Sequence, residues 1–348
     1  MSKPGEILDR ERLFLAVDEG WLASHQEEAI DPDLPIIDPH HHLWDRSSRY
    51  LLDEVVADVS GGHNVIATVF VQCEEMYRVG GDPNLAPVGE TEFANGVAAM
   101  SASGKYGSTR ICAGIVGAAE LRLGARVDAV LEAHLRAGGG RFRGIRQRSV
   151  WDADASIKGS LTEVPKGLLL DAAFRTGFAR LSRFGLSFDA WLFHPQIPEL
   201  TDLASAYPQT PIILDHAGAA LGIGAYADRS REVFADWRRN MAALSRHSNV
   251  TVKLGGFGMH LFGFDLDPTS RAKPATSQEL ARLWRPYVDS CIELFGPDRC
   301  MFESNFPVDK RAAGYTVLWN AFKRLVQPYS EDERAALLKD TARRVYRL

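Results

Sequence analysis

The feature of this sequence that most constrains its fold is the alternation of short apolar runs with longer amphipathic stretches. Each run is rich in β-branched and aromatic residues and is apolar enough to be buried on both faces, as strands of a parallel sheet are. The eight runs are Ile36–Trp44, Val65–Cys73, Arg110–Val116, Phe142–Ser149, Ser187–His194, Pro211–His216, Val250–Gly255 and Cys300–Asn305. Strands that alternate with helices predict a parallel α/β sheet, and eight of them at this spacing predict a closed (β/α)8 TIM barrel.

The stretches between the runs have apolar residues three or four positions apart, which is the spacing of a helix that packs one face on a sheet. One stripe consists of Leu170, Phe174, Phe178 and Leu181, and another of Phe234, Trp237, Met241 and Leu244. The length of 348 residues does not require a second domain, because α/β barrels often exceed about 200 residues. We expect one barrel domain over residues 34–348, preceded by an irregular or helical N-terminal arm over residues 1–33.

Charge and cysteine content argue against several classes of protein. The net charge of −5 opposes binding to nucleic acid or to an anionic membrane, since both require a concentrated positive field. The four cysteines form no CxxC pair, so they predict neither a thiolate zinc site nor a disulfide framework. The first residues do not resemble a signal peptide, and no apolar run approaches the roughly 20 residues that span a bilayer. We expect a cytoplasmic protein that acts on a small molecule.

Three consecutive histidines at the end of the first run are the main candidates for chemistry. Side chains alternate along a strand, so Asp38, His40 and His42 share one face and His41 points the other way. Two imidazoles at this spacing can bind one divalent ion, or can polarise a carbonyl and position a water without metal. Asp38 is a candidate to orient one of the rings. The alternative is a pair of hydrogen-bonded core histidines.

Three motifs together resemble the amidohydrolase-related (amidohydrolase 2) family, in the branch that includes sugar lactonases and other hydrolases that open ester rings. The motifs are Ile37–Asp45, Ile213–Gly218 and Met301–Asp309. The resemblance covers the chain from about Pro35 onward and implies a hydrolase barrel with its site at the ends of the strands. It implies His40, His42 and His194 as candidate metal ligands, and His194 and His216 as candidate catalytic residues.

The last strand departs from the family pattern. Most of the superfamily has an aspartate at the position of Asn305, where it acts as general base and often binds metal. The neutral amide of Asn can neither take up a proton nor bind a metal as a charged ligand. Glu303 shares the inward face with Asn305, Asp309 lies just beyond, and His216 is the third candidate for the base. Asp309 and His216 are favoured. The alternative role of Glu303 and Asp309 is in ordinary ion pairs.

Arg146 and Arg148 on the fourth strand share a face and are expected to point into the barrel mouth. A guanidinium there is costly unless it meets an anion, which indicates a substrate carboxylate or a developing oxyanion. The alternative is exposed charges, or ion pairs with the aspartates that follow. Lys253 and Glu74 are weaker candidates of the same kind, and we expect both to be structural.

The leading hypothesis is a hydrolase that opens a cyclic carboxylic ester, a lactone that carries a carboxylate, with a water activated at the C-terminal mouth of the barrel. A divalent metal ion, zinc first, or the imidazoles alone would polarise the carbonyl, and metal-free catalysis stays open because of Asn305. Two alternatives are a metal-dependent, non-oxidative decarboxylase of an aromatic or enolic acid and a non-catalytic, ligand-binding barrel. No nucleotide-binding glycine motif or GxSxG elbow is present. The sequence also leaves open whether the chain forms a homo-oligomer.

Overall fold

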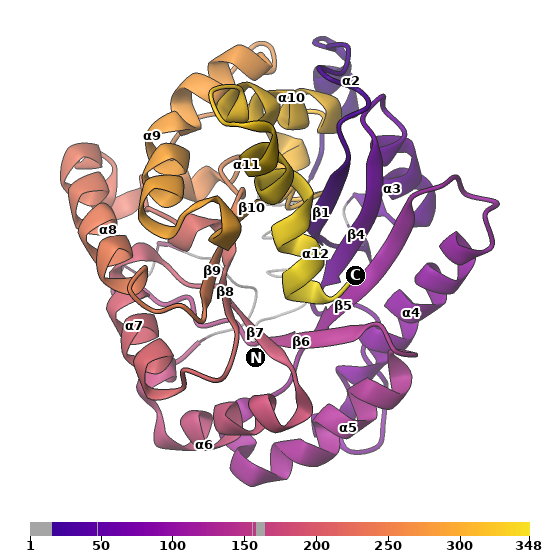
Figure 1. Cartoon of the computed structure of the whole chain (residues 1–348), viewed down its shortest axis with the longest axis vertical. Coiled ribbons are helices and arrows are strands. Elements are labelled where there is room, and N and C mark those ends of the chain that lie inside the picture. Colours follow the sequence, from indigo (N-terminus) through magenta and orange to yellow (C-terminus); the bar gives the residue numbers. More distant parts are fainter. Residues whose placement is uncertain (1–15, 47, 155, 158–163) are drawn as a thin grey trace.

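The eight predicted strands form one parallel sheet that curves into a barrel (Figure 1). This computed structural model describes residues 16–46, 48–154, 156–157 and 164–348. The strands, each parallel to the next, are β1 (Ile36–His41), β4 (Val65–Val71), β5 (Arg110–Gly117), β6 (Phe142–Arg146), β7 (Ser187–Ala190), β8 (Ile212–Leu214), β9 (Val250–Leu254) and β10 (Cys300–Phe302). A parallel bridge between His41 and Phe306 joins the segment after β10 to β1. The predicted (β/α)8 TIM barrel is confirmed.

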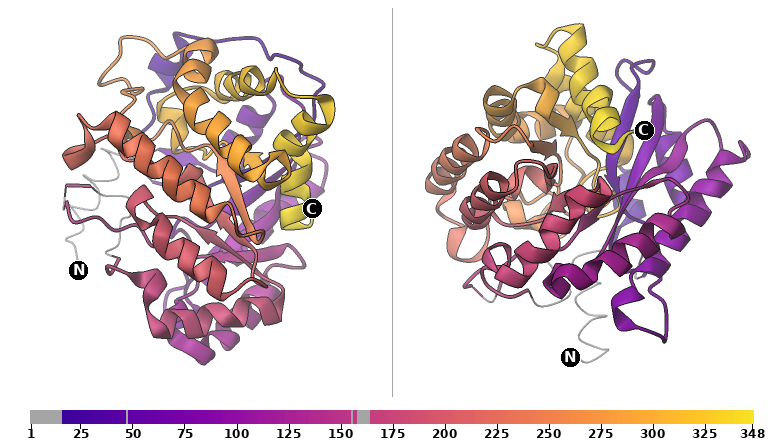
Figure 2. Two further views of the ribbon diagram at one scale, coloured as in Figure 1. Left: turned by 60° about the vertical axis from the view of Figure 1, so that its left-hand side comes forward. Right: turned by 60° about the horizontal axis from the view of Figure 1, so that its bottom comes forward.

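Helices cover the outside of the barrel (Figure 2). They are α3 (Leu52–Val59), α4 (Val88–Ala102), α5 (Val127–Ala137), α6 (Ala172–Leu181), α7 (Ile197–Ala206), α8 (Ser230–Leu244), α9 (Ser277–Phe295) and α10 (Tyr315–Val326). The chain continues through α11 (Glu331–Ala335), the π-helical turn η11 (Ala336–Asp340) and α12 (Thr341–Tyr346). The 3-10 turns are η1 (Pro83–Leu85), η2 (Leu121–Arg126), η3 (Leu168–Leu170), η4 (Ser182–Phe184), η5 (His194–Gln196), η6 (Asp215–Gly218), η7 (Gly224–Tyr226), η8 (His260–Phe262), η9 (Pro297–Arg299) and η10 (Asp309–Arg311).

The apolar stripe predicted for α6 is largely correct. Phe174, Phe178 and Leu181 are fully buried against the barrel. Leu170, however, is 52% exposed, so its place in the stripe was predicted wrongly. The reason is the cap of the helix: the Asp171 carboxylate accepts a hydrogen bond from Phe174 N at 2.7 Å. Because this cap begins α6 after Asp171, Leu170 lies outside the helix, in η3.

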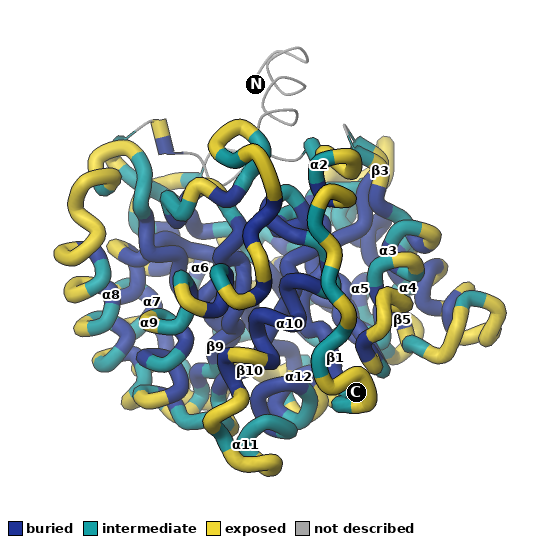
Figure 3. The backbone as a smooth tube through the Cα atoms, turned by 90° about the horizontal axis from the view of Figure 1, so that it is seen from above, coloured by how far each residue is buried: buried dark blue, intermediate teal, exposed yellow. Residues whose placement is uncertain are grey.

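The two ends of the barrel differ. Helices α11 and α12 lie at one end, while α2 (Glu19–Ala23) and the small antiparallel pair β2 (Trp44–Asp45) and β3 (Arg49–Tyr50) lie at the other (Figure 3). Ala342 and Tyr346 of α12 pack into a buried cluster with the inward residues of five strands, which are Ile37, Ala67, Val69, Val71, Val116, Ile213 and Met301. One end of the barrel is thus filled with apolar side chains, and polar chemistry is confined to the C-terminal ends of the strands.

The segment before β1 packs on the barrel within its described part. Trp21 Nε1 donates to the Arg271 carbonyl at 3.0 Å, and Glu27 accepts from Ser277 N at 2.8 Å. Residues 1–15 of the predicted arm lie outside the described residues. None of the helices in the described ranges has the length and apolar character needed to cross a membrane.

Two glycines on outer helices test the packing of this shell. A Cβ on Gly177 of α6 would lie 2.0 Å from the Leu121 carbonyl oxygen, whereas a Cβ on Gly96 of α4 would meet nothing within 4 Å. Alanine is the better helix former by about 1 kcal/mol, so Gly96→Ala should raise the free energy of unfolding by about that amount. Gly177→Ala should lower it by about 1–3 kcal/mol, because the backbone contact must open. Urea unfolding of both variants measures the difference, and stabilisation by Gly177→Ala would contradict the packing described.

Candidate active site

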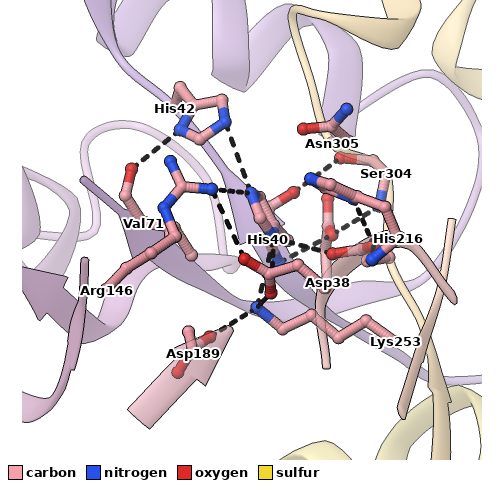
Figure 4. Close-up of polar contacts among 12 residues, drawn as sticks. Asp38, His40, His42, Val71, Arg146, Asp189, His216, Lys253, Ser304 and Asn305 are labelled. Carbon is pink, nitrogen blue, oxygen red and sulfur yellow. Dashed lines mark hydrogen bonds and ion pairs between the residues drawn. The ribbon is translucent and has the colours of Figure 1, made fainter. Parts of the chain in front are cut away.

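The rings of His40 and His42 meet inside the barrel at the end of β1 (Figure 4). Their Nε2 atoms are 3.3 Å apart, and both side chains are buried. His41 points to the outside of the sheet, where its Nε2 lies 2.9 Å from Thr68 Oγ1. His40 and His42 therefore share one face and His41 points to the other, as the sequence predicted. The pairing register shifts between Asp38 and His41, so that Ile37, and not Asp38, packs with the inward residues.

The hydrogen bonds of His42 fix its tautomer. Its Nδ1 lies 2.7 Å from the Val71 carbonyl oxygen, which can only accept, so Nδ1 carries the proton. Nε2 of His42 then has its lone pair directed at His40. Burial, followed by the neighbouring His40 and Arg146, lowers the pKa of His42 well below its usual value. The ring is therefore neutral and available as a ligand or a hydrogen-bond acceptor.

Glu303, just after β10, links two of the histidines. Its Oε1 accepts from His216 Nδ1 at 2.7 Å, and its Oε2 lies 2.7 Å from His40 Nδ1. Burial alone would raise the pKa of Glu303, but the imidazoles of His216 and His40 outweigh burial and lower it. Glu303 is therefore a buried carboxylate that lies between the two rings and pairs with both of them.

Two glycines after β9 make room for this arrangement. A Cβ on Gly255 would lie 2.4 Å from Glu303 Cγ, and a Cβ on Gly256 would lie 2.5 Å from His216 Cγ and Nδ1. Gly256 also has φ +69°, in the left-handed region that glycine favours. The backbone at the end of β9 thus forms a slot in which the Glu303 and His216 side chains pack.

The centre of the barrel holds more charge than the sequence predicted. Three buried carboxylates lie beside two buried cationic side chains; they are Asp189, Asp215 and Glu303 with Arg146 and Lys253. Lys253 and the adjacent His40 hold the pKa of Asp215 well below its usual value although burial opposes this. With all three carboxylates ionised the cluster has one negative charge in excess, which favours one further cation, either a proton on an imidazole or a metal ion. Burial, which raises the pKa of Asp189, acts against its ionisation.

The donor set suits a divalent metal ion. Zinc with tetrahedral nitrogen ligands at about 2.0–2.1 Å places them roughly 3.3 Å apart, which is the separation of the two Nε2 atoms of His40 and His42. Ligand atoms of His40, His216 and Glu303 also lie within 4.8 Å of one another. Oε2 of Glu303 is buried and pairs with His40 Nδ1, but it accepts no hydrogen bond from the described residues. These residues therefore fit a metal ion.

Arg146 lies in the barrel as predicted and contacts the histidine pair. It is 3% exposed, and its Nη1 is 3.2 Å from His40 Nε2 and 3.5 Å from Asp215 Oδ2. Its Nη2 donates to the carbonyl oxygen and side chain of Gln72. Arg148 is nearer the solvent, where its Nη1 pairs with Glu74 Oε1 at 2.7 Å. Lys253, which we expected to be structural, lies in the centre of the cluster.

Both arginines line a cavity of about 210 Å³ beside the histidines. The cavity lies over the C-terminal ends of β4, β5 and β6, where barrel enzymes bind substrates. Its polar wall consists of Gln72, Glu74, Tyr77, Glu120, Arg122, Arg146, Gln147 and Arg148. A small polar molecule bound there would touch Arg146, which in turn touches His40.

Asn305 faces Asp309. The Asn305 backbone has φ +54°, and its Nδ2 donates to Asp309 Oδ1 at 2.9 Å. The other oxygen of Asp309 accepts from Gly258 N at 2.9 Å. Burial is the main cause that raises the pKa of Asp309 to about 7, which is a suitable value for a general base at neutral pH.

His194 lies apart from the other site histidines. It begins η5, and its Nδ1 accepts from Leu221 N at 3.2 Å. Its ring meets the edge of Tyr226, with the ring centroids 5.2 Å apart. In the described chain no hydrogen bond, ion pair or ring contact joins His194 to His40 or His216. Its role as a ligand or catalyst stays a prediction.

Asp38 was expected to orient a ring, but its carboxylate binds backbone. It accepts from His40 N at 3.3 Å and from Ser304 N at 2.9 Å, and Tyr315 donates to it at 3.0 Å. Glu303 is the carboxylate that holds the rings. Asp215 was not among the residues predicted for the site, although it directly precedes His216 in the second motif.

The sequence and the fold of this chain are similar to those of known amidohydrolases. The sequence model of the family described as Amidohydrolase matches residues 37–348. An uncharacterized protein y4mH of Sinorhizobium fredii is 34% identical over 91% of this chain and 99% of its own length. An L-fucono-1,5-lactonase of Burkholderia multivorans is 28% identical over 68% of this chain and 72% of its own. A solved amidohydrolase from Burkholderia multivorans with bound zinc is 27% identical, with a TM-score of 0.67, over 90% of this chain and 99% of that one.

The glycine slot generates a prediction for the site. Gly256→Ala places a methyl group against the His216 ring and should lower kcat/KM by at least about 100-fold, since small misplacements of reacting groups have effects of that size. Gly185→Ala is the matched control: Gly185 has a similar φ of +62°, but a Cβ there meets nothing within 4 Å. Both variants should lose stability, and only the first should lose activity. Equal activity in the two would contradict the slot.

Proposed function

The chain belongs to the amidohydrolase family, and on that premise we propose that it is a lactonase, which hydrolyses a cyclic carboxylic ester at the mouth of the barrel. The observation that carries the proposal is the convergence of the His40 and His42 Nε2 atoms beside the Glu303–His216 pair, with Arg146 and an open polar cavity next to them. The 28%-identical relative that is an L-fucono-1,5-lactonase supports a lactone as the substrate class.

His216 is the best candidate for the general base. Glu303 accepts the proton of its Nδ1 at 2.7 Å, so Nε2 has the lone pair and can take a proton from water. A carboxylate that orients an imidazole in this way also stabilises the imidazolium that forms. The water attacks the lactone carbonyl, and the ring C–O bond breaks as the tetrahedral intermediate collapses. His216 then returns the proton to the alkoxide that leaves, which gives the hydroxy acid.

Arg146 is suited to stabilise the oxyanion of the tetrahedral intermediate. Its guanidinium is buried beside His40 and already faces the cavity, so it need not reorganise during the reaction. A metal ion held by the Nε2 atoms of His40 and His42 would, when bound, polarise the same carbonyl, and zinc is an ion that imidazole ligands favour.

Arg148 lies on the wall of the cavity and is suited to bind a carboxylate on the substrate. Its guanidinium pairs with Glu74, which a substrate carboxylate would replace or share. The polar residues around it, among them Gln147 and Tyr77, supply further hydrogen-bonding groups. We propose that this wall recognises the part of the substrate away from the scissile bond.

A screen of lactones with a pH indicator tests the proposed reaction. Ring opening releases acid, so we expect the indicator to report turnover of at least one sugar or carboxylated lactone. His42→Ala should lower that turnover by at least about 1,000-fold while the protein stays folded, since it removes one of the two converging imidazoles. Running the screen with and without a chelator measures metal dependence. Release of CO2 from an aromatic or enolic acid would instead identify a decarboxylase, and ligand binding without product would identify a non-catalytic barrel.

The identity of the base can be decided by the pH dependence of two variants. With His216 as base, His216→Asn should lower kcat/KM by about 100-fold or more, and Asp309→Asn should keep the rising limb of the profile. With Asp309 as base, its pKa of about 7 would set that limb, and Asp309→Asn would abolish it. Activity rises with pH in both cases, because a base must be deprotonated.

Stability gives an independent measure of the Asp309 carboxyl. Its pKa is raised from 3.8 to about 7 in the folded protein, so the folded state binds this proton more tightly than the unfolded state does. The resulting stabilisation is complete below pH 4 and is lost as the pH rises through 7. Subtracting the unfolding free energy of the wild type from that of Asp309→Asn gives a difference at each pH. This difference should be larger at pH 9 than at pH 4, by on the order of 2–4 kcal/mol. Urea unfolding at the two pH values measures this, and a constant difference would contradict it.

A further inference from the structure

Lys253 of β9 is the centre of the buried cluster. Its ammonium group donates to Asp189 Oδ2 at 2.7 Å, lies 3.1 Å from His40 Nδ1 and forms an ion pair with Asp215 Oδ1 at 3.0 Å. The side chain is fully buried. Because the ammonium lies between two buried carboxylates and the His40 ring, the position of Lys253 determines one side of the pocket in which that ring lies.

Asp189 of β7 connects Lys253 to the opposite end of the barrel. The oxygen that binds Lys253, Oδ2, also accepts from the Tyr346 hydroxyl at 2.6 Å. The second oxygen, Oδ1, is buried and has no hydrogen-bond partner among the described residues. The ammonium also lies 5.4 Å from the centre of the Tyr346 ring. Without the hydroxyl, Lys253 would be the one hydrogen-bond donor left to the Asp189 side chain in the described part of the chain.

Helix α12 holds Tyr346 in this position. The ring packs in the apolar cluster that fills the closed end of the barrel, and it is fully buried. Arg143 of β6 donates to the Tyr346 carbonyl at 2.5 Å and to the Arg347 carbonyl at 3.4 Å. The hydroxyl group therefore projects from a helix that is fixed to the barrel by both packing and hydrogen bonds.

We propose that Tyr346 is a positioning residue of the active site: its hydroxyl orients Asp189, Asp189 orients Lys253, and Lys253 holds the His40 ring on the side opposite to His42. The chain of contacts runs through the barrel axis from the closed end to the reacting groups. Its effect on turnover rests on the proposed lactone hydrolysis, whereas its effect on the His40 ring does not.

The test is Tyr346→Phe, which removes one oxygen and keeps the ring. Outer partners of site histidines typically contribute 10–100-fold to activity, so kcat should fall by about tenfold or more. KM should change less than about twofold, because the cavity is at the other end of the barrel. Asp189→Asn, which keeps the size of the side chain and removes its charge, should act in the same direction and serves if Tyr346→Phe does not fold.

Tyr50→Phe is a matched control. The Tyr50 hydroxyl donates to Asp58 at 2.8 Å, Asp58 binds Lys310 at 3.1 Å, and the ammonium lies 5.6 Å from the centre of the Tyr50 ring. The same three residue types thus make the same contacts without touching a site histidine. This variant should keep kcat. An equal fall in kcat for the two tyrosine variants would assign the effect to general destabilisation and overturn the proposal.

Nitrogen-15 NMR of the histidine rings provides a readout that needs no substrate. The signals of His40 are assigned by their loss in His40→Gln. Tyr346→Phe should shift both ring nitrogens of His40, and Tyr50→Phe should leave them unchanged. Unchanged His40 signals with a lowered melting temperature would show a purely structural role and overturn the proposal. If the wild type opens no lactone, the proposed function fails, and these spectra still decide the role of Tyr346.

Discussion

The ion pairs of Lys253 are the interaction on which the rest of the site depends. An ammonium and several carboxylates are costly to bury, and they are stable in the barrel only because each charge has close partners of opposite sign. Asp189 comes from β7, Asp215 follows β8 and His40 ends β1, so the cluster ties together strands from both halves of the barrel. The groups of the site are therefore placed by rigid strands, and this is the preorganisation that catalysis requires.

The backbone at the strand ends makes the second contribution. His216 and Asn305 adopt φ of +55° and +54°, a conformation that is uncommon for residues with a side chain. Both follow short strands, β8 and β10, and both side chains turn from the strand direction toward neighbouring polar groups. Gly255 and Gly256 leave the space that Glu303 and His216 occupy. Residues with positive φ and glycines without a Cβ are thus found together where the reactive groups meet.

The sequence predicts the barrel well, because apolar runs of strand length alternate with helical stripes over most of the chain. It also predicts the inward direction of His40, His42 and Arg146, because alternation along a strand is a local property. It does not predict which inward groups pair across the barrel. The sequence offered Glu303 as a candidate base and Lys253 as a structural residue, and it predicted the partners of neither, since pairing depends on strand register and on the space left by glycines. Side-chain alternation along one strand cannot show which residues of distant strands will be in contact.

The replacement of aspartate by Asn305 has a local electrostatic explanation. Asn305 Nδ2 donates to Asp309 Oδ1 at 2.9 Å, and a carboxylate at position 305 would instead face that oxygen with a second negative charge. Asp309 is buried and has a pKa of about 7, so a further anion beside it would be strongly disfavoured. Glu303, two residues earlier, carries a negative charge that His40 and His216 offset. In this barrel the carboxylate that follows β10, Glu303, lies against the imidazoles, and the Asn305 amide lies beside Asp309.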